Sequence, residues 1–297
     1  MGVVYLSAFF YSLITGLSFI FGKVALNVSS VIDFLAYRFS ASAFGLFLLI
    51  IFRLVKVDFN FKKVVKILPL ALFYPLLFFA FQSYGLKHAT AIETGLITAA
   101  VPIFTLIGAS LFLKEKTTLF QKLSIIASVG GVMLITIMKN TPFEITNFKG
   151  TFLILLSALS FAGYAILARV LSKEFSSIEL SAVMILISFI FFNAVALINN
   201  AINQTLPAFI KMPFNRQFLI SILYLGVLST LVTSYFSNYI LSKIEAAKMS
   251  VFGNFGTIIT IIASTVYLKE SLFYYHVIGT ILIIGGVLGT NFLDKRS

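Results

Sequence analysis

The chain has 297 residues, of which 60% are hydrophobic and 11% are charged, and its mean hydropathy is +1.05. A soluble domain carries about 25% charged residues, so this composition excludes a water-soluble enzyme or binding domain and predicts an integral membrane protein. The net charge of +12 does not indicate a nucleic-acid partner, because lysine and arginine gather in the cytoplasmic loops of membrane proteins. The chain has no cysteine, so we expect no disulfide and no thiol-bound metal.

Ten segments are long and apolar enough to cross a bilayer, which takes about 20 residues per helix. They span residues 3–26, 31–52, 66–86, 90–113, 118–138, 150–171, 178–199, 217–241, 246–268 and 272–292. The first segment has no basic leader and no cleavage site, so we expect it to remain as a helix. Most connections are short, and no soluble domain fits between the helices. The longest connection, 200–216, contains two prolines and is expected at the membrane surface.

The loops also predict an orientation. A cytoplasmic N-terminus places most of the loop lysines and arginines inside the cell. The 53–66 loop decides most of this, because it holds Arg53, Lys56, Lys62, Lys63 and Lys66. The positive-inside rule therefore predicts a multi-pass protein of the cell (inner or plasma) membrane with both termini in the cytoplasm.

One pattern occurs twice along the chain. Leu113-Lys114-Glu115 and Gly130-Gly131 return as Leu268-Lys269-Glu270 and Gly285-Gly286, at a constant offset of 155 residues (270 − 115 and 285 − 130). The same offset relates Tyr84 to Tyr239, so the third to fifth helices match the eighth to tenth. The first and sixth helices match more loosely, at a different offset.

The repeat divides the chain into two halves, 1–140 and 141–297, of five helices each. Five is an odd number, so the second half must enter the membrane upside down. We therefore predict an all-α membrane protein with ten transmembrane helices, arranged as two inverted five-helix repeats around a central cavity. Inverted repeats are typical of secondary transporters, whose substrate site lies near the middle of the membrane between the halves.

These residues resemble the drug/metabolite transporter superfamily, and specifically its EamA-type ten-helix members, over nearly the whole chain. The motifs that carry the resemblance are Arg38-Phe39, Gly85-Leu86-Lys87, Ala91 with Pro102, Leu113-Lys114-Glu115, Ala158-Leu159-Ser160-Phe161 with Tyr164, and Glu270 with Gly279 and Gly286. The chain departs from the family where Thr15 and Phe161 stand in place of tryptophans, Thr257 in place of the second proline and Ser124 in place of a glycine. The resemblance implies export of a small metabolite, often an amino acid, through a central cavity lined mainly by helices 1, 3, 4, 6, 8 and 9.

Nine residues are candidates for substrate binding because they bring hydroxyls, amides, rings or a freed carbonyl into the helices. They are Ser18, Gln82, Tyr84, Thr98, Pro102, Tyr164, Asn238, Tyr239 and Asn254. Small hydroxyls in membrane helices often bond to their own backbone, so Ser18 has that alternative role. Asn254 lies two turns inside its helix, where it either lines the pocket or bonds to a neighbouring helix.

Pro102 and the repeat-related tyrosines each have two interpretations. Pro102 frees the carbonyl of Thr98, which makes a hinge or a substrate acceptor, or only a locally satisfied kink. Tyr84 and Tyr239 lie toward opposite faces of the membrane, where they serve as an outer and an inner gate or as interfacial anchors.

The intramembrane charges are treated separately. Glu93 is a candidate proton carrier, because a carboxylate in a low-dielectric cavity exchanges protons near neutral pH. Its alternative role is at the start of its helix, where an acid complements the helix dipole. Arg38 either pairs with Asp33 or Glu93 or snorkels to the membrane surface. Glu270, like its repeat partner Glu115, closes a helix where the dipole disfavours it, so we expect each to have a structural partner.

Together these features predict a secondary transporter that exports a small, partly apolar metabolite, such as an amino acid or a similar solute, by alternating access and without ATP. Strongly anionic substrates are less favoured, because no dense cluster of Arg and Lys is present. The alternative is a flippase for lipid-linked sugars or lipids, and an intramembrane enzyme or a sensor is a weaker one. We expect no catalytic residue, cofactor or metal. The expected partners are the small-molecule substrate and membrane lipid, but not nucleic acid, in a monomer or homodimer.

Overall fold

The structure is a computed structural model that describes residues 2–57, 60–113, 119–138, 145–244 and 246–292. Every regular element within these ranges is a helix. The elements are α1 (Gly2–Leu26), α2 (Val31–Ile51), α3 (Phe61–Ala71), η1 (Leu72–Leu77), α4 (Phe78–His88), α5 (Ala91–Thr98), α6 (Val101–Leu113), α7 (Leu119–Met138), α8 (Ile145–Leu171), α9 (Ser177–Ile202), α10 (Leu206–Lys211), η2 (Met212–Phe214), α11 (Arg216–Leu223), η3 (Tyr224–Val232), α12 (Thr233–Lys243), α13 (Ala246–Ala263), η4 (Ser264–Leu268) and α14 (Tyr274–Phe292).

Each of the ten predicted segments is a helix or a continuous stack of helices. The predicted boundaries hold to within a few residues, except that the third segment begins at Phe61 and the sixth at Ile145. Seven spans in the described ranges are long and apolar enough to cross a membrane, and α7, α13 with η4, and α14 supply the other three. The predicted fold class, an all-α membrane protein of ten helices in two inverted repeats, is confirmed.

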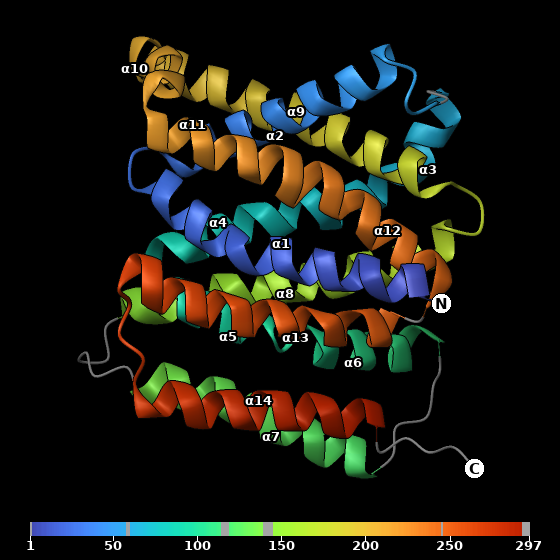
Figure 1. The fold of residues 1–297 in the computed structure, drawn as a ribbon, viewed down its shortest axis with the longest axis vertical. Helices are drawn as coiled ribbons and strands as arrows, with labels where there is room; N and C mark the ends of the chain where they lie inside the picture. The colour runs from blue at the N-terminus through green and yellow to red at the C-terminus, as the bar shows by residue number, and fades with distance from the viewer. Residues whose placement is uncertain (1, 58–59, 114–118, 139–144, 245, 293–297) are drawn as a thin grey trace.

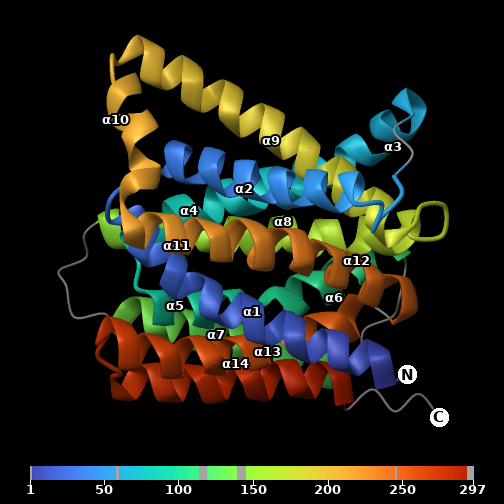
Figure 2. The same cartoon turned by 45° about the horizontal axis from the view of Figure 1, so that its top comes forward.

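The helices lie side by side in two layers (Figure 1). One layer holds α2, α3, α4, α9, α11 and α12, and the other holds α5, α6, α7, α13 and α14. Helices α1 and α8 lie where the layers meet, since α1 packs on both α12 and α13, and α8 packs on both α4 and α6. Each layer therefore takes helices from both halves of the sequence. At one edge α10 joins the ends of α9 and α11 (Figure 2), so the 200–216 connection lies across the helix ends.

Small residues bring helices of the two halves into close contact. A Cβ atom on Gly16 of α1 would lie 2.5 Å from the carbonyl oxygen of Gly256 on α13. The same holds for α7 and α14, where a Cβ on Gly131 would lie 2.8 Å from the carbonyl oxygen of Gly279. In a membrane, where helices gain no hydrophobic energy by associating, such close backbone packing is a main source of cohesion.

The long third and eighth helices are each interrupted in the middle by a π-helical segment, η1 and η3. Tyr74 in η1 has extended backbone angles (φ −144°, ψ 122°), and Pro75 follows it. The 155-residue offset relates Tyr74 to Ser229 in η3, so both π-helical segments occupy the same place in the repeat. A discontinuity such as the one at Tyr74 exposes backbone groups that a cavity can use.

Candidate functional site

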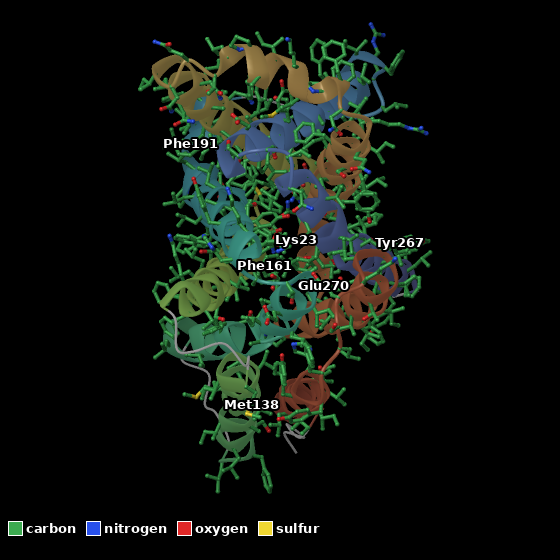
Figure 3. All side chains as sticks on the ribbon, turned by 90° about the vertical axis from the view of Figure 1, so that its left-hand side faces the viewer. Lys23, Met138, Phe161, Phe191, Tyr267 and Glu270 are labelled. Atoms are coloured by element: carbon green, nitrogen blue, oxygen red, sulfur yellow. The ribbon has the colours of Figure 1, made fainter. Side chains whose placement is uncertain are left out.

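A cavity of about 80 Å³, which is room for a few water molecules, lies between the two layers. Its lining comes from α1, α2, η1, α4, α5, α6, α8, η3 and α13. The apolar lining residues include Phe19, Tyr74, Phe78, Phe79, Val101, Phe161 and Met249, and the polar ones include Thr15, Ser18, Arg38, Gln82, Thr98, Ser229 and Thr257. Figure 3 looks along the helices, with Phe161 labelled near the line where the layers meet. The site is thus a mostly apolar chamber with a few polar groups.

Arg38 on α2 supplies a positive charge to this chamber while remaining only 3% exposed. Its Nε donates to Thr230 Oγ1 at 2.8 Å, and its Nη2 donates to the Ser229 carbonyl oxygen at 3.1 Å and to Ser229 Oγ at 3.2 Å. The guanidinium also lies over the ring of Phe79, with Cζ 3.9 Å from the ring centroid. All of these partners are electrically neutral.

Both sequence-based interpretations of Arg38 are therefore wrong. Asp33 instead accepts hydrogen bonds from Asn200 Nδ2 at 2.6 Å and from Ser30 Oγ at 2.7 Å. The side chain does not snorkel, because it is buried. Within the described parts of the chain, no carboxylate forms an ion pair with Arg38. The burial of a cation without a counter-charge at membrane depth is costly, which makes Arg38 the residue that most needs a functional explanation.

Three of the nine candidate binding residues, Ser18, Gln82 and Thr98, line the cavity. The hydroxyl of Ser18 donates to the Thr15 carbonyl oxygen at 2.6 Å, and that of Thr98 donates to the Thr94 carbonyl oxygen at 2.7 Å. Each hydroxyl thus donates to its own helix, as the alternative interpretation of Ser18 expects. Its oxygen can still accept a hydrogen bond from a solute. The Gln82 amide makes no hydrogen bond to any described residue, which leaves its donors for the cavity.

Tyr164 and Asn238 belong to a buried network beside the cavity rather than to its wall. The Tyr164 hydroxyl donates to Asn238 Oδ1 at 2.9 Å and lies 2.8 Å from Ser237 Oγ. Asn238 Nδ2 donates to Ser181 Oγ at 2.9 Å. The network ties α8, α12 and α9 together, and its groups are satisfied by one another, so its evident effect is on rigidity.

Three of the remaining candidates are not among the residues that line the cavity. Tyr84 is 40% exposed and Tyr239 is half-buried, and neither is among the lining residues. Pro102 is buried as the second residue of α6, after a break that ends α5 at Thr98. In the first turn of a helix a backbone N–H has no partner within the helix, so the missing N–H of proline loses no hydrogen bond there. Pro102 therefore begins a new helix rather than kinking a continuous one. The side chain of Asn254 lies outside the described residues.

The two carboxylates near the start of α5 have capping roles. Glu93 Oε2 accepts from the Thr90 N–H at 3.0 Å, and Thr90 Oγ1 accepts from the Glu93 N–H at 3.1 Å, which forms a capping box. Glu270 reaches from the second half and accepts from the N–H groups of Ala91 and Ile92 at 2.9 and 3.0 Å. Glu270 thus has the structural partner that the sequence predicts. Its repeat partner Glu115 lies outside the described residues.

Comparison with known proteins decides the family. The sequence model of the EamA-like transporter family matches residues 2–137 and 148–292. The chain belongs to this family. A transporter called YcxC from Bacillus subtilis (strain 168), described as uncharacterized, is 46% identical over 295 residues, which covers 99% of this chain and 94% of that one. A WAT1-related protein of Arabidopsis thaliana is 25% identical over 95% of this chain and 82% of its own.

A solved crystal structure shares the fold of this EamA-family chain. The two superpose with a TM-score of 0.69 at 13% sequence identity, over 100% of this chain and 99% of the other. At this identity the likeness concerns the fold alone. Family and fold together make the chain a multi-pass membrane transporter.

The sequence reasoning missed Arg38, Tyr74, Phe78, Phe79 and Ser229 as cavity residues. The aromatic residues gave no signal, because phenylalanine is common throughout this chain. A signal for Arg38 was available in the repeat. The offset of 146 residues that relates Lys23 to Arg169 (169 − 23) relates Arg38 to Met184, so this charge occurs in one half only.

Proposed function

We propose that this EamA-family protein is a secondary transporter that exports a small, partly apolar organic metabolite across the cell membrane by alternating access, with both termini in the cytoplasm. The observation that carries the proposal is the cavity between the two layers, whose walls include Tyr74 at the break in the third helix and Ser229 in the π-helical segment of the eighth. Secondary transporters bind substrate in such a place, at the interface of the repeats and beside a discontinuous helix.

Transport is tested by reconstituting the protein into liposomes and measuring counterflow across a panel of small organic acids, amino acids and amines. Counterflow is expected for at least one chemical class without ATP, because it requires only the exchange of labelled solute outside for unlabelled solute inside. If no solute in a broad metabolite panel moves, the proposal is wrong.

Alternating access is tested by the distance between the layers at each end of the bundle. The chain contains no cysteine, so engineered cysteines can be spin-labelled without further changes. Lys87 on α4 and Lys269 beside η4 are exposed at one end, and Lys243 on α12 and Leu111 on α6 are exposed at the other. A transported substrate is expected to shift the two distance distributions in opposite directions. Parallel shifts at both ends would contradict alternating access.

Coupling to protons through Glu93 has a separate test. The capping box favours a structural role for this carboxylate, and Gln at this position keeps an oxygen that accepts from the Thr90 N–H. Glu93→Gln is therefore expected to fold normally and to keep the pH dependence of transport. If the variant instead loses that dependence while remaining folded, Glu93 carries the proton.

A further inference from the structure

The charges around the cavity do not balance. Arg38 is the cation among its described lining residues, and no aspartate or glutamate is among them. The guanidinium is always charged near neutral pH, and its protein partners Ser229, Thr230 and Phe79 do not neutralise it. Removal of a cation from water without a counter-charge is strongly unfavourable, so an occupant that brings one negative charge would be favoured by the cavity itself.

The guanidinium also has a donor to spare. Nε and Nη2 are engaged by η3, whereas Nη1 makes no hydrogen bond to any described residue. Among the described residues, the fully buried nitrogen and oxygen atoms without a hydrogen-bond partner do not include Nη1. Part of its surface is therefore accessible from the cavity. Gln82 adds amide donors to the same lining. A guanidinium N–H and an amide N–H₂ that line one cavity can together donate to the two oxygens of a carboxylate.

We propose that Arg38 is the anchor for a carboxylate, and that the transported solute is a small organic monoanion with an apolar body. This inference rests on the proposed transport function and names its substrate class. Tyr74, Phe78 and Phe161 form the apolar wall that would hold the body of the solute. Arg38 with one carboxylate gives an occluded complex of zero net charge, which is the least costly state in a membrane.

Other charge classes fit less well. A zwitterionic amino acid leaves the complex with a net charge of +1, and its ammonium group finds no carboxylate among the described lining residues. A cationic amine adds repulsion from Arg38. A phosphate monoester carries nearly two negative charges, which a single guanidinium does not neutralise. Net charge therefore ranks the monocarboxylate first and the amine last, with the zwitterion and the dianion between them, because these leave net charges of +1 and about −1.

The test uses solutes that share the 3-methylbutyl group and differ in charge. These are 4-methylpentanoate, leucine, 3-methylbutylamine and 3-methylbutyl phosphate, with 4-methylpentanamide as the neutral probe. In proteoliposomes at pH 7, the monocarboxylate is expected to exchange at least about tenfold faster than any other charged member, as a buried charge pair contributes that much selectivity or more.

Arg38→Met removes the charge and installs the residue found at the repeat-related position, Met184. It is expected to lose about 100-fold in exchange of 4-methylpentanoate, the order of effect of truncating a buried charge pair. It is also expected to gain exchange of 4-methylpentanamide, which has the same shape and no charge. That gain shows that the variant is folded and that its cavity is open. Arg38→Lys keeps the positive charge but loses the planar guanidinium, which can donate two parallel hydrogen bonds to a carboxylate. It is expected to retain the preference for monoanions with about tenfold weaker apparent affinity.

The outcomes separate the two proposals. The carboxylate anchor is wrong if the wild type exchanges leucine or the amine faster than 4-methylpentanoate, or if Arg38→Met keeps the preference for monoanions. Either result leaves the proposed transport function standing. If no member of the series and no member of the wider metabolite panel moves, both proposals fail. Loss of 4-methylpentanoate exchange in Arg38→Met with gain of the amide supports both.

Discussion

The two halves of this protein agree at their helix ends and differ at their centre. In the first half Lys23 Nζ donates to the Leu86 carbonyl oxygen at 2.9 Å, and in the second half Arg169 Nη1 donates to the Leu241 carbonyl oxygen at 2.8 Å. Each cation therefore satisfies the C-terminal end of the third helix of its own half. The second helices also begin alike, with the capping pairs Ser30–Asp33 and Ser176–Glu179.

At the centre the same comparison gives unlike pairs. Arg38 corresponds to Met184, and Tyr74 corresponds to Ser229. Pro102 begins a helix, whereas its counterpart Thr257 lies within the continuous helix α13 and donates to the Gly95 carbonyl oxygen at 3.1 Å. The duplicated scaffold is maintained where helix ends must be satisfied, and the residues have diverged where they face the cavity. This comparison can be tested at both places.

The largest effect on stability is expected where the fifth helices of the two halves meet. Gly131→Ala forces a methyl group against the Gly279 carbonyl and should cost up to about 3 kcal/mol in unfolding free energy. At the neighbouring Gly130 an added Cβ would have open space within 4 Å, so Gly130→Ala should be neutral or stabilise by about 0.5 kcal/mol. Thermal unfolding in detergent compares the two variants, and equal melting temperatures would contradict the packing argument.

The matched cations should have matched effects. Lys23→Met and Arg169→Met each remove a charge-assisted hydrogen bond to a helix end, which costs about 2 kcal/mol. Thermal unfolding of the two variants is expected to give similar losses, with the exposed Lys173→Met as a control that changes little. If one variant is strongly destabilised and the other is not, the two sites are not structurally equivalent.

An unlike pair should separate function from stability. The 146-residue offset relates Tyr164 to Ser18. Tyr164→Phe breaks the buried contacts to Ser237 and Asn238 and should cost about 1.5 kcal/mol of stability. Ser18→Ala breaks only a bond within its own helix and should leave the melting temperature nearly unchanged, while altering exchange kinetics through the cavity wall. Paired melting and counterflow measurements test this, and the reverse pattern would refute it.

The smallest effect is expected at the surface. Lys66 and Glu174 form an ion pair whose side chains are 57% and 53% exposed. A double-mutant cycle of Lys66→Ala and Glu174→Ala should give a coupling energy below about 1 kcal/mol, which salt at about 0.5 M should largely remove. A large, salt-insensitive coupling would show that this end of the molecule depends on the pair.

The sequence was sufficient to predict the fold, because the lengths of the apolar segments and the repeated motifs can both be read directly along the chain. It did not reveal the π-helical segments η1 and η3, since hydropathy runs unbroken through both, and only the first contains a proline. Nor did it reveal the environment of Arg38. Its nearest acid in the sequence is Asp33, whereas its actual partners, Ser229 and Thr230, are 191 and 192 residues away. Pairings across such separations follow from how the two halves interlock, and no local pattern encodes them.

That separation also has a consequence for biogenesis. During synthesis α2 enters the membrane long before η3 exists, so the guanidinium of Arg38 arrives without the oxygens that later surround it. Until the eighth helix is made, the charge must stay with water or with the insertion machinery. We therefore expect the final packing of α2 to be a late event that waits for the second half, so that the side chain that gives the mature cavity its charge also delays the assembly of the protein.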